Sequence, residues 1–317
     1  MLFPKKVLIG IQEGRCNLKC PKCYTHGANR PSENLRPTGI MDRELFARIL
    51  DECQPHRPRI APQTWDEPLL NPDILDYLAE IKKRNLPVTM DTNGLLLTDR
   101  IIDGLIALGV DSVFVSIDAY TATTLEKTRG ITNLEGLRRR VLRFLERRGG
   151  RAFPRIGVSF VVEEANRGER DAFVEEWSRH VDVVRVNELF QRDRSLTVAP
   201  AHARTPCWSL WDSLMIHPDG EAALCCVDTH YQTRIGNVKE SGVAGVWNGP
   251  FFGWARKCHE QGEAGRIPIC GTCTLWSNDE PVDRSTPELV IKATSTHTYY
   301  NRRDRLENMI RDNRYFK

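Results

Sequence analysis

The feature that most constrains the fold is an alternation that runs to about residue 190. Short runs rich in β-branched residues alternate with longer segments whose apolar residues recur at helical spacing. This pattern is typical of βα units, in which parallel strands are joined by helices that cover the sheet. Six strands are predicted, at 6–11, 57–62, 87–92, 112–117, 156–162 and 181–189. The chain is therefore predicted to be an α/β protein with a parallel sheet.

The helices between these strands are predicted from their apolar faces and their capping residues. Asp42 and Thr98 stand where N-caps belong, directly before segments with an apolar stripe. The segment 134–150 places leucine and valine on one side and its arginines elsewhere. We interpret these arginines as a solvated outer face, since a single apolar stripe is what a helix packed on a sheet requires.

Composition and charge exclude several classes of function. The 317 residues carry 45 basic and 42 acidic side chains, so no strong overall field indicates nucleic acid or a membrane surface as a partner. No apolar run reaches the length of a signal-peptide core or a spanning helix, so a cytoplasmic protein is predicted. In a reducing compartment the ten cysteines are expected to serve metal binding or catalysis instead of disulfides.

Three of these cysteines, Cys16, Cys20 and Cys23, directly follow the first predicted strand. The carboxyl ends of parallel strands are where α/β proteins build their active sites. Three thiolates on one loop can hold three corners of a [4Fe–4S] cube and leave one iron open to a substrate or cofactor. The alternatives are buried structural cysteines and a zinc site completed by His26, although zinc sites usually take their cysteines as CxxC pairs.

A CxxxCxxC motif followed by an aromatic residue, after the first strand of a six-unit βα chain, resembles the radical S-adenosylmethionine (SAM) superfamily. The resemblance extends over about the first 190 residues and implies a partial (β/α)6 barrel. It also implies that the open iron binds SAM, and that an electron from the cluster cleaves SAM to a 5′-deoxyadenosyl radical. That radical would then abstract hydrogen from an unactivated C–H bond, the hard step that the cofactor supplies.

The same resemblance assigns roles to residues at successive strand ends. Tyr24 matches the aromatic that contacts the adenine region, and Glu67 with Pro68 matches a Gly-Glu-Pro motif that binds the SAM amino group. Asp66 stands where that motif has glycine. The remaining three candidates, which would face the ribose or the methionine carboxylate, are Asn93, Ser116 and Asp118. The motif "KTRG", which contains Arg129, also recurs after the fourth strand in relatives. A structural role and a functional role explain it equally well.

After residue 187 the helical period is lost, and six of the ten cysteines lie between Cys207 and Cys273. The order of a cysteine, then Gly220 with four residues between it and the next cysteine, then a CxxC pair resembles the SPASM/twitch extension of radical SAM enzymes. Since no cysteine follows Cys273, the short twitch form with one auxiliary [4Fe–4S] cluster is expected. Its ligands would be Cys207, Cys225, Cys270 and Cys273, with a four-cysteine zinc ribbon as the alternative.

Three cysteines remain without a ligand role. Cys53 is predicted to lie in the core and Cys258 has no assigned partner. Cys226 is tethered to a predicted ligand and could face the cavity, where its weak S–H bond would donate hydrogen to a substrate radical. Some radical SAM epimerases use a cysteine in this way, and the resemblance implies the same role for Cys226. The alternatives are a spectator role for Cys226, or ligation by Cys226 with Cys225 as the spectator.

These observations lead to a prediction with several alternatives. The predicted reaction is epimerisation of an sp3 carbon in a small-molecule or oligosaccharide substrate of sugar or aminoglycoside type. The polar residues expected near the cavity, which would suit such a substrate, are Glu188, Gln191, Asp228, His230 and Tyr231. The runner-up is oxidation of a secondary alcohol to a ketone with electron transfer to the auxiliary cluster. In this reaction the chain would resemble the twitch dehydrogenase of the butirosin pathway. Peptide epimerisation or thioether maturation ranks lower, and a non-catalytic zinc protein lowest. A flavodoxin or ferredoxin is the expected reductant. The predicted parts are the barrel (1–190), the twitch/SPASM-like domain (191–280) and a closing segment (281–317), which is expected to form a short helix near its end.

Overall fold

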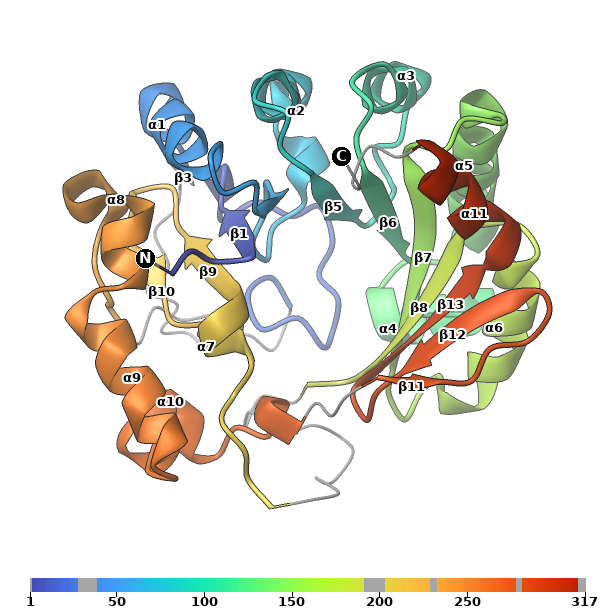
Figure 1. Ribbon diagram of the computed structural model, residues 1–317. Helices are drawn as coiled ribbons and strands as arrows, with labels where there is room; N and C mark the ends of the chain where they lie inside the picture. The colour runs from blue at the N-terminus through green and yellow to red at the C-terminus, as the bar shows by residue number, and fades with distance from the viewer. Residues whose placement is uncertain (1, 28–38, 191–202, 229–232, 278–280, 313–317) are drawn as a thin grey trace.

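A computed structural model describes residues 2–27, 39–190, 203–228, 233–277 and 281–312 of the chain (Figure 1). A strongly curved sheet forms the inner layer, and helices cover its outer side. Helices α1, α2, α3, α5 and α6 cover the N-terminal part of the ring, and α8, α9 and α10 lie on its other flank (Figure 1). The arrangement is the α/β class that the sequence pattern predicts, in the barrel form that the family resemblance implies.

All six predicted strands are present, and their order along the sheet follows the chain. Strand β1 pairs in parallel with β4, and β5, β6, β7 and β8 form a second parallel run. A single parallel bridge between Ile60 and Val88 connects the two runs. The bounds are β1 Lys6–Ile9, β4 Arg59–Ala61, β5 Thr89–Thr92, β6 Ser112–Ser116, β7 Arg155–Val162 and β8 Val183–Glu188. A short antiparallel pair, β2 Gln12–Glu13 and β3 Gly39–Ile40, follows β1.

The helices begin where the capping residues predict. The Asp42 carboxylate accepts hydrogen bonds from two N–H groups of the first turn of α1, and Thr98 accepts one from Ile101 at the start of α3. The helices of the barrel are α1 Arg43–Cys53, α2 Ile74–Lys83, α3 Asp99–Ala107, α4 Ala122–Arg129, α5 Leu134–Arg148 and α6 Arg170–Ser178. Those of the cysteine-rich part are α7 Ser209–Asp212, α8 Val238–Trp247, α9 Pro250–Glu260 and α10 Pro268–Gly271.

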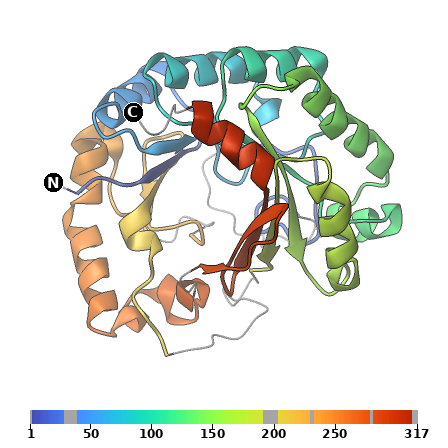
Figure 2. The same ribbon diagram turned by 45° about the vertical axis from the view of Figure 1, so that its right-hand side comes forward.

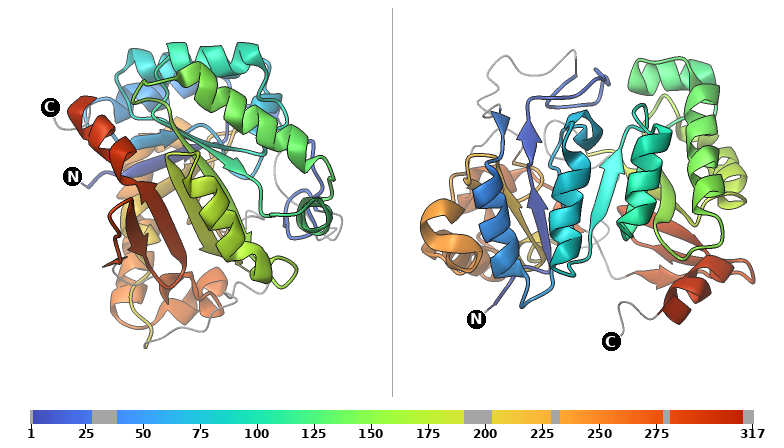
Figure 3. Two further views of the ribbon diagram at one scale, coloured as in Figure 1. Left: turned by 90° about the vertical axis from the view of Figure 1, so that its right-hand side faces the viewer. Right: turned by 90° about the horizontal axis from the view of Figure 1, so that it is seen from above.

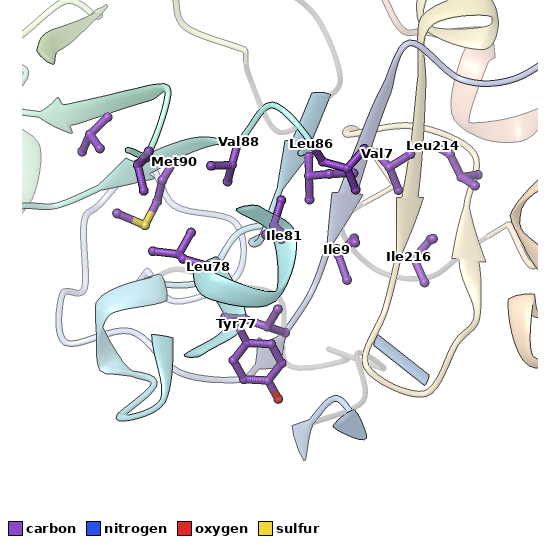
Figure 4. Packing of buried hydrophobic residues seen from close by; sticks show 14 of the residues in the cluster. Val7, Ile9, Tyr77, Leu78, Ile81, Leu86, Val88, Met90, Leu214 and Ile216 are labelled. Atoms are coloured by element: carbon purple, nitrogen blue, oxygen red, sulfur yellow. The ribbon is translucent and has the colours of Figure 1, made fainter. Parts of the chain in front are cut away.

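The cysteine-rich part continues the barrel instead of standing apart from it. Strand β9 (Ser213–Ile216) pairs in parallel with β1, and β10 (Ala222–Ala223) pairs with β9 in a hairpin that turns at Gly220. Gly220 has a positive φ of 86°, a conformation that glycine adopts without strain. Leu214 and Ile216 share a core with Val7, Ile9 and the side chains of α2 (Figure 4). The auxiliary part is thereby fixed to the first strand of the barrel.

The C-terminal segment adds strands that the sequence analysis did not predict. Strands β11 (Val282–Asp283), β12 (Leu289–Ala293) and β13 (His297–Arg302) form an antiparallel meander, and β13 pairs with β8 (Figure 3, left). The expected closing helix is present as α11, Arg303–Asp312, and it follows β13 directly. The segment 281–312 therefore extends the barrel sheet and ends in the predicted helix.

The arginines of α5 form the expected outer face with one exception. Arg138, Arg143 and Arg147 pair with carboxylates of neighbouring helices. Arg148 is instead buried, and its guanidinium pairs with Asp182 at the start of β8. The prediction for Arg148 is wrong because its acidic partner comes from a distant part of the chain. In the described ranges, no helix is both long enough and apolar enough to cross a membrane.

Candidate functional site

A cavity of about 360 Å³ opens at the carboxyl ends of the barrel strands. The three cysteines of the loop after β2, Cys16, Cys20 and Cys23, line it together. Glu67, Asn93 and Ser116, from the ends of three other strands, line the same cavity. The topology explains this convergence, because successive parallel strands deliver their carboxyl ends to one edge of a sheet.

Each of the three thiols faces a hydrogen-bond donor. The Leu18 N–H approaches the Cys16 sulfur at 3.5 Å, and the His26 N–H approaches the Cys23 sulfur at 3.3 Å. The Arg129 guanidinium lies 3.8 Å from the Cys20 sulfur. Donors of this kind favour the thiolate form, in which cysteine binds iron. Because burial raises the pKa of Cys16 to about 11, that thiol needs a cationic partner such as iron before it ionises.

The cysteine loop is braced by a residue whose role the sequence did not show. Asp66 is buried, and its Oδ1 accepts a hydrogen bond from the Arg15 N–H at 2.9 Å. The same oxygen lies 2.8 Å from Nε2 of His26, on the other side of the three cysteines. Asp66 therefore connects both ends of the loop, and its φ is not positive, so the replacement of glycine brings no left-handed strain. Asp66 engages the His26 ring that the zinc alternative needed as a ligand.

Glu67 is held at the cavity wall by the end of strand β5. Its carboxylate accepts hydrogen bonds from the Thr92 hydroxyl at 2.6 Å and from the Asn93 N–H at 2.7 Å. Burial raises the pKa of Glu67, and these hydrogen bonds act against that rise. The Asn93 side chain is fixed by Asn17 in the cysteine loop at 2.7 Å. Both residues are thus oriented in advance at the position that the resemblance gives to SAM.

Ser116, Asp118 and Tyr24 occupy different places. Ser116 lines the cavity, and its hydroxyl accepts a hydrogen bond from Ser159 at 3.3 Å. Asp118 does not line it: the carboxylate is fully buried and pairs with Lys22 and Arg129, both at 2.8 Å. Asp118 thus orients Arg129 toward Cys20. It was expected to face the ribose or the methionine carboxylate, and it does not because Lys22 and Arg129 hold its carboxylate elsewhere. Tyr24 lies outside the lining and donates its hydroxyl to the Phe190 carbonyl.

The C-terminal cysteines line a second, small cavity. Its wall contains the four expected ligands together with mainly apolar residues, and the cysteines are Cys207, Cys225, Cys270 and Cys273. Burial raises the pKa of Cys207 to about 12. The Leu275 N–H donates to the Cys273 sulfur at 3.4 Å. Four thiols around one apolar cavity fit a cluster without an open iron.

Cys226 differs from its neighbour Cys225. It is absent from the lining of the second cavity, and its side chain is exposed. The Cys226 carbonyl accepts a hydrogen bond at 3.2 Å from the indole of Trp65, a residue of the cysteine-loop cavity. The surrounding protein raises the pKa of Cys226, while the ammonium of Lys6 lowers it. Since Lys6 begins strand β1 and lines the barrel interior, the adjacent cysteines occupy different surroundings.

The other candidates from the sequence have simpler explanations. Cys53 is buried in the core as predicted, and Cys258 is also buried there. The Asp228 carboxylate accepts a hydrogen bond from the Thr233 N–H at 2.9 Å, so it stabilises its own loop. Gln191, His230 and Tyr231, which the sequence suggested as polar groups near the cavity, lie outside the described residues.

Comparison with known proteins establishes the family. The sequence profile of the radical SAM superfamily matches residues 14–175, and that of the SPASM iron–sulfur cluster-binding domain matches residues 207–274. The chain belongs to the radical SAM superfamily. As a radical SAM enzyme with a SPASM domain, it uses a [4Fe–4S] cluster that binds SAM and an auxiliary iron–sulfur cluster. Both cysteine groups fit these cofactors, and the zinc alternatives no longer apply.

Individual relatives span several activities. The tungsten-containing aldehyde ferredoxin oxidoreductase cofactor-modifying protein of Pyrococcus furiosus is 34% identical, over 82% of this chain and 85% of that protein. Mycofactocin maturase MftC of Mycobacterium tuberculosis is 24% identical, over 58% of this chain and 44% of that protein. Among solved structures, BtrN with AdoMet and 2-DOIA matches with a TM-score of 0.59 and 16% identity, over 86% of this chain and 94% of that one. Streptococcus suis SuiB with S-adenosylmethionine matches with a TM-score of 0.65 and 15% identity, over 87% of this chain and 72% of that one. The two structures share the fold.

The Asp66 brace leads to a testable prediction. Asp66→Gly restores the residue usual in the family motif but removes the acceptor shared by Arg15 and His26. The loss of hydrogen bonds to a buried charged group is expected to weaken the loop by about 1.5–3 kcal/mol. Iron of the SAM-binding cluster should therefore pass to a chelator faster than in the wild type, as followed by visible absorbance. Asp66→Asn keeps the acceptor oxygen and should behave like the wild type. Equal rates for wild type and Asp66→Gly would contradict the brace.

Proposed function

We propose that this radical SAM enzyme abstracts hydrogen from an sp3 carbon of a small molecule and epimerises that centre with Cys226 as hydrogen donor. The observation that carries the proposal is the divergence of two adjacent cysteines. Cys225 lines the auxiliary cavity with the other expected ligands, whereas Cys226 is exposed and electrostatically coupled to Lys6 in the barrel. A cysteine that is free of the cluster and near the barrel interior is what a hydrogen donor requires.

The residues of the chain divide the work in this proposal. When bound, the cluster and SAM supply the 5′-deoxyadenosyl radical that takes the substrate hydrogen. Cys16, Cys20 and Cys23 hold that cluster, while Glu67 and Asn93 provide a carboxylate and an amide toward the amino acid part of SAM. Tyr24 and Ser116 keep the family roles expected of them, whereas Asp118 positions Arg129 toward Cys20 and does not itself face SAM. The domain limits at residues 190 and 280 also stay part of the proposal.

Cys226 completes the reaction on the opposite face of the substrate. Its S–H bond breaks as a new C–H bond forms, and the carbon is left with inverted configuration. The resulting sulfur radical needs one electron and one proton, which we assign to a flavodoxin or ferredoxin and to solvent. The reducing cytoplasm is the compartment in which such a reductant and ten reduced cysteines fit. The substrate belongs to the small organic molecules, either a natural-product sugar or, as the name of the Pyrococcus relative favours, a cofactor.

The deciding experiment follows deuterium from solvent. The reconstituted enzyme is incubated in D2O with SAM, a reduced flavodoxin and a small-molecule extract of its host, and products are analysed by mass spectrometry. An epimerase places one deuterium on the product carbon, because the thiol of Cys226 exchanges with solvent. A product two mass units lighter without deuterium would instead establish dehydrogenation and overturn the proposal. In Cys226→Ala, formation of 5′-deoxyadenosine should persist while the deuterated epimer is lost.

The reactivity of Cys226 can be tested without a substrate. When the anaerobic holoenzyme is treated with iodoacetamide at a pH high enough to ionise a thiol of raised pKa, Cys226 should be alkylated because the residue is exposed and is not an expected ligand. Cys225 should resist until the clusters are removed with a chelator. Peptide mass spectrometry of both samples reports the two sites separately. If Cys226 were protected and Cys225 labelled, Cys226 would be the cluster ligand in place of Cys225. That result would exclude Cys226 as the hydrogen donor.

A further inference from the structure

A second large cavity lies at the other end of the barrel from the cysteine loop. It measures about 710 Å³ and is lined by residues at the amino ends of the strands, among them Lys6 of β1, Arg59 of β4 and Arg155 of β7. Met309 of α11 lines it as well, and Figure 2 shows this helix lying across one end of the ring. We refer to this space as the lower cavity.

The lower cavity carries a large excess of positive charge. Seven cationic side chains line it, against two carboxylates, Asp91 and Asp111. Both carboxylates are already engaged. Asp91 pairs with Arg185, and Asp111 pairs with Lys82 at 2.8 Å and accepts the Val88 N–H at 2.7 Å. The acids of the cavity therefore leave most of its cations uncompensated.

Four of these cations have no carboxylate within ion-pair distance among the described residues. They are Lys5, Lys6, Arg57 and Arg59. Burial lowers the pKa of Lys6, the Asp91 carboxylate acts against this, and the charges of Arg59 and Arg185 lower the pKa further. Several cations gathered around one space repel one another, and a bound anion would relieve that repulsion.

The lower cavity adjoins the site of the proposed reaction. Lys6, Asp91 and Arg185 line both the lower cavity and the cysteine-loop cavity. Lys6 also acts electrostatically on Cys226. The Arg185 guanidinium is fixed 4.3 Å above the ring of Phe114, so the junction has a rigid cationic side. A molecule held by its anionic end below this junction would direct its remainder toward the cysteine-loop cavity.

We propose that the lower cavity binds a phosphate-type polyanionic group of the substrate, with Lys6 and Arg59 as its main contacts. Four cations without a carboxylate at ion-pair distance in the described ranges favour several negative charges in a small volume, which a phosphate or diphosphate carries and a single carboxylate does not. This inference rests on the proposed function, for which it names the substrate class. Its test uses binding alone and can therefore fail independently of the reaction.

Inorganic pyrophosphate serves as the probe, in calorimetric titrations of the anaerobic holoenzyme. Lys6→Met combined with Arg59→Gln should weaken binding at least tenfold, and Arg59→Gln alone, at an exposed position, should also weaken it. The matched control, Arg100→Gln with Arg139→Gln, removes two exposed arginines from the outer helices and should change the affinity less than twofold. Iron content of each variant verifies that it has folded.

Each outcome bears on the proposal. Selective loss of pyrophosphate binding in the lower-cavity variants supports it. No binding by the wild type, or an equal loss in the control, overturns it. Citrate is titrated in parallel, and tighter binding of citrate than of pyrophosphate would replace the phosphate assignment by a carboxylate-rich ligand. Loss of pyrophosphate binding with unchanged deuterium incorporation would leave the epimerase proposal intact and remove the lower cavity from it.

A separate observation concerns His259 in the auxiliary cavity. Its Nδ1 accepts a hydrogen bond from the Cys207 N–H at 3.1 Å. A backbone N–H can only donate, so Nδ1 carries no proton and the ring proton is on Nε2. Nε2 is buried without a partner in the described part of the chain, and the ring lines the cavity of the four cysteines.

We infer that His259 Nε2–H donates a hydrogen bond to the auxiliary cluster and raises its reduction potential. Donors to cluster sulfurs are among the factors that set such potentials. In a redox titration followed by electron paramagnetic resonance, His259→Phe should shift the auxiliary potential to more negative values at unchanged iron content. His259→Gln, which can place an amide N–H near the same point, should restore part of the shift. An unchanged potential in His259→Phe would overturn the inference.

Discussion

Replacing Cys16, Cys20 and Cys23 together by alanine is expected to lower the iron content of the reconstituted protein from about eight atoms per chain to about four. The three thiols share one cavity and each has its own hydrogen-bond donor, so they act as one ligand set. The expected auxiliary ligands line a different cavity and should keep their cluster. Cleavage of SAM should be lost entirely, since no other described thiols line the cavity that receives it.

Iron and sulfide analysis with Mössbauer spectra measures this result directly. Cys53→Ala with Cys258→Ala is the matched control, because it removes two buried cysteines that line neither cluster cavity. It should retain about eight irons. A wild type with about four irons and one zinc would contradict the auxiliary cluster, and a triple variant that kept all its iron would contradict the ligand assignment.

The parts of the fold that were predicted are those encoded locally. Strands β1 and β4–β8 and their helices follow from residue periodicity, and Asp42 and Thr98 cap helices that begin within a few residues of them. The pairing of β9 with β1 was not predicted, because β1 lies about two hundred residues earlier, as the pairing of Leu214 with Val7 shows. Nothing near Leu214 in the sequence indicates that partner. The same reason applies to β13, which pairs with β8 across the auxiliary part.

The candidate site shows the same division between local and distant information. The spacing of Cys16, Cys20 and Cys23 is local, and the structure brings these residues to one cavity. The roles of Asp66 and Asp118 depend on partners elsewhere in the chain, because Asp66 forms a hydrogen bond with His26 and Asp118 forms an ion pair with Lys22. A buried carboxylate must find a partner, but the sequence does not say which one. Signals for such residues come only from the folded chain.

Replacing Asp182 by alanine is expected to destabilise the protein by about 3–5 kcal/mol, because it leaves a buried guanidinium without its counter-charge. The Asp182 side chain is 2% exposed and Arg148 is 5% exposed. The same carboxylate accepts the Ile156 N–H at 2.7 Å and Arg305 Nε of α11 at 2.7 Å. Asp182 therefore joins helix α5, strand β7 and the C-terminal helix. A fall of at least about 6 °C in Tm is expected, with the clusters reconstituted identically in each sample.

The neighbouring residue of α5 provides the matched control. Arg147 pairs with Asp103 of α3 on the surface, where the aspartate side chain is 52% exposed. Asp103→Ala also removes an aspartate that pairs with an arginine of α5, but solvent screens this pair, so a loss of about 0–1 kcal/mol is expected. Adding Arg148→Met to Asp182→Ala should recover part of the lost stability, since no unpaired charge then remains buried. If Asp182→Ala and Asp103→Ala lowered the Tm equally, burial of the Arg148 charge would not be what makes Asp182 necessary.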